Sequence, residues 1–543
     1  MSILTAIYII TALWLAVYAF NAWILTGLFL KHRHTSTSFR GSGQSQRDDN
    51  ENEDERPMTA DRVISHRSPV SRPRSIFTRE WQENDLPPVT IQLPIFNEAL
   101  VIERLIEAVA RLDYPAHLLQ IQVLDDSTDD TTEIALAKVV EQRRHGVNIE
   151  LLHRSDRTGF KAGALKAGLA TASGEFIAIF DADFVPEPDF LRQTIPPLLD
   201  NPQVGFVQTR WGHLNRDYSL LTATQALAVD GHFVVEQTAR QRSGLIMGFN
   251  GTGGVWRRSC IEAAGGWQGD TIAEDLDLSY RAQLAGWKPL FLLDVVAPAE
   301  IPPQLAAFKR QQFRWAKGSI QCLKKLGWQV LRAPLPWTVK WQALVHLSSY
   351  LAHPLMVLLA IITPILMLTG GTSQIHFPLI YLSLLSMGPP VMYAVAQMVL
   401  YPTRWRQHYK VMPLLIFLGG GIALSNTRAV AEAMLGVGNV FRRTPKFNLA
   451  TAADRWQSSA YRLPADRLSF GELALGLYSL VSAGIAAVNG NAFAIPFILL
   501  YAFGFGYVGL QGVWETRLDK RFKVERSKFR VQHSNVQPAN IQH

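Results

Sequence analysis

The chain has 543 residues, more than one compact domain usually holds, and its formal net charge is +8. Hydrophobic residues make up 48% and charged residues 18%, an average that combines a soluble α/β segment with nearly uncharged apolar blocks. Most of the positive charge flanks those blocks, which favours a membrane surface over a nucleic acid. The chain has only two cysteines, Cys260 and Cys322, and they do not have a metal-binding spacing. No disulfide framework is therefore predicted, and a reducing cytoplasm fits.

The first predicted element is an apolar helix over residues 3–30, which is long enough to span a membrane. It lacks the charged start and the cleavage site of a secretory signal, so we interpret residues 1–31 as an anchor. Lys31 and Arg33 at its end predict that this end faces the cytoplasm. Residues 32–85 have too little apolar content to fold and are expected to be a disordered cytoplasmic linker, either a plain tether or a regulatory segment.

Strand-like and helix-like segments alternate from residue 86 to about residue 330. Strands are predicted at 89–93, 119–126, 147–153 and 175–183, and helices at 97–112, 130–145 and 161–172. This alternation predicts a largely parallel sheet with helices on both faces, followed by interfacial helices to about residue 342. In open sheets of this kind, ligands bind outside the carboxyl ends of the strands, so the polar residues at those ends are the candidate site.

Acidic residues follow two of these strands. The second strand runs into Asp125 and Asp126, and the fourth runs into Asp181-Ala182-Asp183. Side chains two residues apart on an extended segment point the same way, so Asp181 and Asp183 can converge on one cation. Mg²⁺ and Mn²⁺ prefer such oxygen ligands and keep substrate phosphates in their shell. Asp is also common in turns, but two acidic pairs on one sheet favour a metal–diphosphate site. The chain contains no Walker motif, so a P-loop ATPase is not supported.

Several motifs occur in order along the chain: PIFNE, VLDDSTDD, DADF, AEDLDLSYRAQLAGW and QQFRW. Together they resemble the family 2 inverting glycosyltransferases of the GT-A fold, in the processive membrane group that includes cellulose, hyaluronan and chitin synthases. GFNGTGGVWRR and the segment to Trp287 are most similar to the cellulose synthase-like mannan, glucomannan and xyloglucan-backbone synthases. The resemblance covers about residues 86–450 and implies an α/β GT-A domain joined to an α-helical multi-span transmembrane region.

The resemblance also implies roles for individual residues. The donor-binding residues would be Pro94, Phe96, Glu98, Asp125, Asp126, Lys161, Asp181 and Asp183. Asp181 and Asp183 would hold Mg²⁺ or Mn²⁺, although Phe184 stands where some relatives have a further metal-binding His. Asp275 would be the general base that takes the proton of the attacking acceptor hydroxyl. The acceptor-binding residues would be Gly253, Glu274, Gln311, Arg314 and Trp315.

Some of these residues also fit plain structural roles. Thr271 and Glu274 have the spacing of a helix capping box, and acids in a first helical turn are ordinary partners of the helix dipole. Lys161 fits an exposed residue at a helix start. The QQFRW segment fits an interfacial helix, with Trp at headgroup depth and cations facing anionic lipid. For that last motif we expect both roles at once, because the product would leave through the membrane.

The second half of the chain is predicted to cross the membrane four more times. The predicted spans are 343–369 and 377–400, and then 470–489 and 491–514. Between these pairs, 401–469 is expected to hold an interfacial or re-entrant segment, at 411–440, and a loop. The basic tail, 515–543, predicts a cytoplasmic C-terminus.

The loop FRRTPKF resembles the gating loop of cellulose synthases. Phe441, Thr444 and Lys446 match its pattern, and Arg443 replaces a Val. The alternative is an ordinary basic loop beside the membrane. A gating loop must reach the cytosolic diphosphate, which requires an even number of crossings between it and the QQFRW segment and fits two spans there.

The sequence therefore predicts a multi-pass enzyme of the cell membrane with a cytoplasmic catalytic domain. It is expected to be an inverting β-glycosyltransferase that polymerises a sugar from a nucleotide-sugar donor and translocates the polysaccharide. UDP-glucose, and hence a β-glucan product, is favoured by the breadth of its use in the family. A GDP-mannose-dependent mannan or glucomannan synthase is the alternative.

Two further functions are alternatives to this one. A non-processive lipid-linked sugar transferase would typically lack QxxRW and the multi-span half. A transporter without catalysis would usually carry acidic or basic residues in the interiors of its spans, and the interiors of the predicted spans lack them. The expected partners are the donor, the growing polysaccharide and the lipid bilayer, with no nucleic acid.

Overall fold

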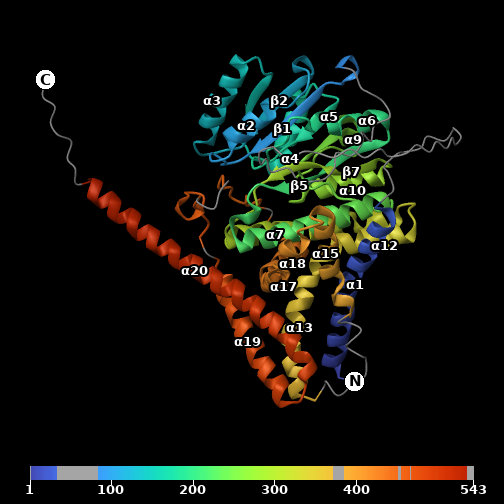
Figure 1. Cartoon of the computed structure of the whole chain (residues 1–543), viewed down its shortest axis with the longest axis vertical. Helices are drawn as coiled ribbons and strands as arrows, with labels where there is room; N and C mark the ends of the chain where they lie inside the picture. The colour runs from blue at the N-terminus through green and yellow to red at the C-terminus, as the bar shows by residue number, and fades with distance from the viewer. Residues whose placement is uncertain are drawn as a thin grey trace, which may run out of the picture.

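The computed structural model describes residues 2–33, 83–370, 384–438, 440–449, 454–464 and 466–534, with side chains only as far as residue 515 in the last range. Nearly all of the predicted linker, the start of the predicted span 377–400 and the side chains of the predicted basic tail lie outside this description. An α/β layer forms one end of the molecule, and long apolar helices extend from it toward the other end (Figure 1).

One seven-stranded sheet forms the centre of the α/β layer, in the order β3-β2-β1-β4-β6-β5-β7. The strands are β1 (Val89–Ile95), β2 (Leu119–Asp125), β3 (Ile149–His153), β4 (Phe176–Ile179), β5 (Val204–His213), β6 (Gly254–Arg257) and β7 (Lys288–Ala299). The first four are parallel, as the alternation predicts, whereas β6 runs antiparallel to both of its neighbours.

Helices cover both faces of this sheet, which confirms the predicted GT-A-like architecture. They are α2 (Ile102–Ala110), α3 (Thr131–Arg144), α4 (Phe160–Thr171), α5 (Phe190–Thr194), α6 (Pro196–Asp200), α9 (Arg258–Ala263) and α10 (Glu274–Leu284). Alternate residues of β4 enter two different cores, Phe176 with residues of α2 and α3, and Ile177 with residues of α4 and α10. Because both faces are covered, every residue of β1 and β4 is buried. The polar residues of β1 are satisfied by β2: Thr90 donates to Gln120 at 2.8 Å, and Gln92 donates to Gln122 at 3.1 Å.

A second group of helices lies where the α/β layer meets the apolar helices. It comprises α7 (Leu220–Gly231), a π-helical turn (His232–Gln237), α8 (Thr238–Arg242) and the long helix α11 (Leu305–Arg332). The QQFRW motif lies on α11. Glu515 accepts hydrogen bonds from the backbone N–H groups of Leu305 and Ala306 at the start of α11, at 3.0 and 3.3 Å.

The remaining helices are mostly apolar. They are α1 (Ile3–His32), α12 (Trp337–Ser348), α13 (Ala352–Leu368), α15 (Gly388–Leu400), α16 (Trp405–Tyr409), α17 (Met412–Gly421), α18 (Ala423–Leu435), α19 (Leu468–Val488) and α20 (Ile495–Ser534). Short 3-10 turns occur at Glu83–Asp85, Ala116–Leu118, Arg216–Tyr218, Ser349–Leu351, Trp456–Ser458 and Ala492–Ala494.

In the part of the chain that the structure describes, four helical stretches are long and apolar enough to cross a membrane. They are Ile3–His32, Trp337–Leu368, Leu468–Val488 and Ala492–Glu515. The helices of Trp405–Gly421 and Ala423–Leu435 are bent by 43° and form either a broken span or a re-entrant loop. The described part of the predicted span 377–400 is a shorter apolar helix, Leu384–Leu400.

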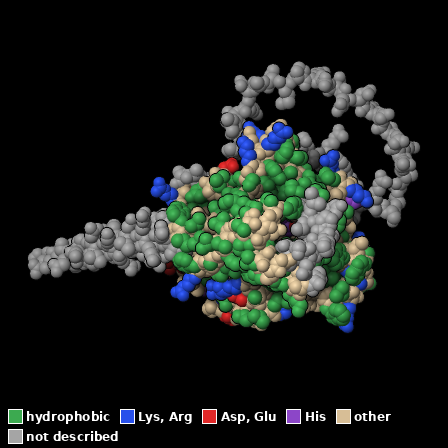
Figure 2. Space-filling view, turned by 90° about the horizontal axis from the view of Figure 1, so that it is seen from below, with side chains coloured by type: hydrophobic (Ala, Val, Ile, Leu, Met, Phe, Trp, Pro, Cys, Tyr) green, Lys and Arg blue, Asp and Glu red, His purple; other side chains and the backbone are tan. Residues whose placement is uncertain are grey.

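Seen from the end opposite the sheet, the molecule presents mostly hydrophobic side chains, with Lys and Arg gathered toward the rim (Figure 2). Large exposed apolar residues there include Leu368, Leu477, Val488, Phe493 and Phe497. A soluble protein rarely exposes such a continuous apolar surface, so this end fits a lipid environment.

Candidate active site

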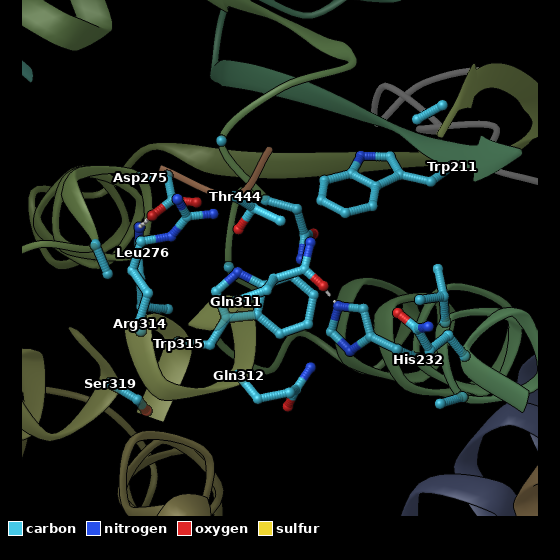
Figure 3. A pocket seen from close by; sticks show the side chains of 18 of the residues that line it. Trp211, His232, Asp275, Leu276, Gln311, Gln312, Arg314, Trp315, Ser319 and Thr444 are labelled. Carbon is cyan, nitrogen blue, oxygen red and sulfur yellow. Dashed lines mark hydrogen bonds between the residues drawn. The ribbon is translucent and has the colours of Figure 1, made fainter. Parts of the chain in front are cut away.

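A cavity of about 670 Å³ lies between the carboxyl ends of the strands, helix α11 and the apolar helices. Its lining includes most of the residues singled out in the sequence: Pro94, Phe96, Glu98, Asp126, Lys161, Asp181, Asp183, Glu274, Asp275, Gln311, Arg314, Trp315, Phe441, Thr444 and Lys446. Figure 3 shows Asp275 and Arg314 on one side, Gln311 and Trp315 in the centre, and His232 on the other side. One cavity thus brings together motifs that are far apart in the sequence.

The two acids that follow β4 are each paired with a lysine. Lys161 Nζ lies 2.6 Å from Asp181 Oδ1, and Lys446 Nζ lies 2.6 Å from Asp183 Oδ2. Lys161 also donates to the carbonyl of Gly251, at 3.0 Å. The other oxygen of Asp183, Oδ1, is buried and has no hydrogen-bond partner within the described residues.

These two carboxylates fit a hard cation. An unpartnered buried oxygen beside a second carboxylate is the kind of donor that Mg²⁺ or Mn²⁺ uses. Among the described residues, no group of three or more His, Cys, Asp or Glu is placed to hold a metal ion. The remaining ligands would therefore be water and the oxygens of a diphosphate.

Asp275 lies in the first turn of α10, and its carboxylate is close to the backbone of Gly251. A Cβ atom on Gly251 would lie 2.9 Å from Asp275 Oδ2, and the φ of Gly251 is +83°. Gly251 is therefore required both for its backbone conformation and for the close approach of its loop to the carboxylate. The N-cap of α10 is Ala273, without a side-chain cap, so the alternative of a Thr271–Glu274 capping box is wrong.

Burial changes the acid–base behaviour of this part of the cavity. It raises the pKa of Asp275, and the nearby Lys161 opposes that rise. Burial and then the charge of Asp275 raise the pKa of Glu274 to about 7. A general base works best when its pKa lies close to the working pH, so a buried carboxylate with a raised pKa suits that role.

The acceptor side of the cavity is formed by two helices. Gln311, Arg314 and Trp315 share one face of α11 because they are three and four residues apart. The π-helical turn opposite contributes His232 and Glu236, whose Nδ1 and Oε2 atoms lie 2.9 Å apart. The second pair was not predicted, because a π-helical turn has no composition signal of its own.

Two predicted site residues do not line the cavity. Asp125 is fully buried and accepts hydrogen bonds from Ser127 N at 2.9 Å and Thr132 Oγ1 at 2.6 Å, so it organises its own loop. Gly253 lies behind the cavity wall, where its carbonyl accepts from Thr209 N at 3.1 Å. Neither residue is among those that line the cavity, so the donor contact of Asp125 and the acceptor contact of Gly253 stay predictions without support from this geometry.

The segment with the gating-like motif lies across the donor end. Arg443 NH1 is 3.2 Å from Glu98 Oε1, and the Phe441 ring packs against Phe160, with centroids 6.1 Å apart. The N–H groups of Phe447 and Leu449 donate to Glu300, at 2.8 and 3.3 Å. These contacts bring the segment to the donor end of the site, and its gating role stays a prediction.

Comparison with known proteins agrees with this geometry. Residues 87–318 match the model of the family described as "Glycosyltransferase like family 2". The chain is 44% identical over 258 residues to "Glucomannan 4-beta-mannosyltransferase 2" of Arabidopsis thaliana, which covers 47% of this chain and 48% of that protein. It is 32% identical over 468 residues to "Probable glucomannan 4-beta-mannosyltransferase 2" of Oryza sativa subsp. japonica, covering 81% of this chain and 78% of that protein.

The match to the Arabidopsis relative thus spans about half of its length, and the match to the rice relative spans most of it. Among solved structures, the chain is similar to "Mannosyltransferase PcManGT from Pyrobaculum calidifontis in complex with GDP-Man and Mn2+", with a TM-score of 0.45 and 20% identity, covering 66% of this chain and 91% of that one. That likeness is too low to bear on function.

A GT-A-like sheet with acids at its strand ends, set beside apolar helices, defines the class as a glycosyltransferase with candidate membrane spans. Within that class, the chain belongs to the family 2 glycosyltransferases, in the cellulose synthase-like group with the glucomannan 4-β-mannosyltransferases. The family resemblance predicted from the sequence is therefore confirmed.

Proposed function

We propose that this protein is a membrane-embedded mannan- or glucomannan-type synthase. It transfers mannosyl units from GDP-mannose to a growing polysaccharide with inversion, and it passes the product into the membrane. GDP-mannose takes the place of UDP-glucose, the donor favoured by the sequence alone, because the similar proteins that cover most of the chain are named as mannosyltransferases.

A single observation carries the proposal: the same cavity is lined by the acids of the sheet and by side chains of the apolar helices. Tyr18 and Asn21 of α1, His353 of α13 and Tyr393 of α15 extend the lining beyond Trp315. Asn21 Oδ1 and His353 Nδ1 are buried without a hydrogen-bond partner within the described residues. Unpaired polar atoms among apolar helices are costly, and the hydroxyl groups of a sugar chain would satisfy them.

The residues divide the chemistry between them. Asp275 takes the proton from the acceptor hydroxyl as that oxygen attacks the anomeric carbon on the face opposite the diphosphate. Trp315 offers an apolar ring face to the acceptor sugar, and Gln311 hydrogen-bonds its hydroxyls. Lys161 and Lys446 place positive charge beside the departing diphosphate. Asp181 and Asp183 would hold a divalent cation, which when bound supplies further neutralisation of that diphosphate.

The donor is tested with purified protein in lipid nanodiscs. GDP-mannose and UDP-glucose are offered separately and together, with Mn²⁺ or Mg²⁺, and nucleotide release and polymer are measured. We expect GDP release with a polymer that an endo-mannanase digests, and loss of both in Asp275→Asn. A glucanase-sensitive polymer from UDP-glucose alone would restore the first expectation, and a single sugar added to a lipid would favour the non-processive alternative.

Translocation is tested separately in sealed vesicles whose catalytic domains face outward. Donor is added outside, and endo-mannanase is added before or after detergent. We expect the polymer to resist the mannanase until detergent opens the vesicles. Polymer that is digested without detergent would show that synthesis occurs without transfer across the bilayer.

A further inference from the structure

Arg157 occupies the donor end of the cavity, in the loop between β3 and α4. Its guanidinium carbon lies 3.3 Å from the centroid of the Phe96 ring and 5.2 Å from that of Phe160. The flat guanidinium thus covers the aromatic face that would otherwise be open to a planar ligand. The sequence motifs did not single out Arg157, because a loop arginine four residues after the end of β3 has no distinctive spacing.

The polar side of Arg157 is not fully used by the protein. Its Nε atom is buried and has no hydrogen-bond partner in the part of the chain that the structure describes. Burial lowers the pKa of Arg157, and the carboxylate of Asp126 opposes that effect. A buried donor without a partner is unfavourable, so this arrangement fits a group that a ligand completes.

Asp126 is the neighbouring acid on the cavity wall. Arg154 holds it with two hydrogen bonds, from Nε at 2.8 Å and from NH2 at 2.6 Å, which fix the orientation of the carboxylate. The donor end therefore presents a fixed acceptor, Asp126, beside a planar donor, Arg157. Arg157 stacks on the ring of Phe96, and Asp126 N donates to the carbonyl of Ile95, the residue before Phe96, at 3.1 Å.

A guanine base matches this pair better than uracil does. Guanine offers N–H donors at N1 and N2 along one edge and the acceptors O6 and N7 along the next, and an arginine can bond O6 and N7 together. Uracil offers one N–H between two carbonyls and has no counterpart of N7. A carboxylate alone would accept from either base, so the arginine carries the discrimination.

We infer that Arg157 reads the O6/N7 edge of the donor's base and makes this site selective for guanine nucleotides. In the donor-free molecule, the guanidinium covers Phe96. With the nucleotide bound, the base stacks in this aromatic corner, Asp126 accepts from its N–H groups, and Arg157 donates to O6 and N7. This assignment rests on the proposed use of a nucleotide-sugar donor, and it makes Arg157 a residue that determines donor specificity.

The test uses nucleotide binding, measured by calorimetry on the full-length protein in nanodiscs with Mn²⁺. The ligands are GDP, 7-deaza-GDP, which lacks only the N7 acceptor, inosine diphosphate, which lacks the N2 amine, and UDP. The variants are Arg157→Met and Arg157→Lys. Arg192→Met is the matched control, since Arg192 pairs with Asp113 on the outside of the same domain.

For wild type and the control, we expect GDP to bind about 10-fold more tightly than 7-deaza-GDP or UDP, the usual size of one bidentate base contact. Arg157→Met should bind GDP only as tightly as wild type binds 7-deaza-GDP. In this variant, replacing GDP with 7-deaza-GDP should have no further effect on affinity. Inosine diphosphate should remain weaker than GDP in both proteins, because its missing contact belongs to Asp126. Arg157→Lys should behave like Met, since a single ammonium cannot make the paired contact.

Two results would overturn the inference. One is equal binding of GDP and 7-deaza-GDP to wild type. The other is an equal loss of GDP and UDP in Arg157→Met that Arg157→Lys restores, which would assign the arginine to the diphosphate. A wild-type protein that binds none of these nucleotides would instead contradict the proposed function itself.

Discussion

Asp275 and Lys161 face each other across the loop of Gly251, and their charges are coupled. Burial raises the pKa of Asp275, and the positive charge of Lys161 lowers it again. A general base is active when it is deprotonated, so kcat/KM should fall as the pH decreases through a value above the ordinary range of an aspartate. Lys161→Met removes the opposing charge and should move this acidic limb to higher pH, as well as lowering the rate.

The measurement is kcat/KM for donor consumption by wild type and Lys161→Met between about pH 5 and 9. This range includes carboxylate pKa values that are raised toward neutrality. Arg192→Met serves as the control with an unchanged limb. An acidic limb that stays in place when Lys161 is removed would mean that a group other than Asp275 sets it.

The two predicted roles of Trp315, acceptor binding and membrane-interface anchoring, lead to different expected effects of substitution. If its ring stacks on the acceptor sugar, Trp315→Ala should reduce polymer formation by about 10-fold or more while donor hydrolysis persists, and Phe should partly restore the polymer. A mere interface anchor would accept Tyr fully and would lose insertion rather than activity. The measurement is polymer and free nucleotide per correctly inserted molecule for Ala, Phe and Tyr variants. Unchanged polymer in the Ala variant would return Trp315 to the anchor role.

At the scale of elements, α11 is held by carboxylates from the last two apolar helices. Glu472 of α19 is fully buried, and its Oε1 lies 2.7 Å from the Nζ of Lys309, which is two residues before Gln311. Glu515 of α20 binds the first N–H groups of α11. The position of Gln311, Arg314 and Trp315 relative to Asp275 therefore depends on helices that are distant from α11 in the sequence.

This connection can be tested by exchanging the charges. Lys309→Glu and Glu472→Lys each leave like charges buried together and should destabilise the docking of α11 by several kcal/mol, with loss of polymer synthesis. The double variant should recover part of the activity, and only part, because Asp466 Oδ2 lies 3.5 Å from Lys309 Nζ and would repel the carboxylate that replaces this amine. Exchange of the surface pair Asp113 and Arg192 is the control. A double variant that is no better than the single ones would show that the pair does not position α11.

Elements with strong local patterns could be predicted from the sequence. Features that depend on packing between distant segments could not. The strand expected at 119–126 is β2 (Leu119–Asp125), and the helix expected at 130–145 is α3 (Thr131–Arg144), because alternation and turn residues mark their ends. The antiparallel strand β6 was not predicted, since its four residues are too few to show a period. The helix expected to begin at 343 begins at Trp337, as its first turns are interfacial rather than apolar.

The site shows the same division. Spacing placed the acids at the correct edge of the sheet, but it cannot tell which of two adjacent aspartates faces outward, and here Asp126 does while Asp125 turns inward. Arg157, Gly251 and His232 reach the cavity from loops and a π-turn, and only the folded chain brings them together. Local pattern is enough for an element, whereas a cavity is defined by contacts between distant segments.

At the scale of the molecule, the apolar helices and the α/β domain predict which parts of the chain lie on each side of a bilayer. The turn between α19 and α20 lies at the end opposite the sheet (Figure 1). Both native cysteines are buried, so introduced cysteines can be labelled against a low background. We expect Ala492→Cys to react with an impermeant maleimide from outside intact cells, and Glu133→Cys on α3 to react only after permeabilisation. Labelling of both from the same side would contradict the predicted topology.

If Asp183 holds the proposed divalent cation, its ion pair with Lys446 affects when that cation can bind. The amine is a competitor tethered to the same chain, with an effective concentration on the order of mM, so a free divalent ion must displace it before reaching Asp183. Mn²⁺ alone should therefore bind weakly to wild type and more tightly to Lys446→Met, whereas retention of GDP should change in the opposite direction. Electron paramagnetic resonance of free Mn²⁺ measures the first and calorimetry the second, and weaker Mn²⁺ binding in the variant would refute the competition. A site with this exchange would acquire metal together with each donor rather than storing it.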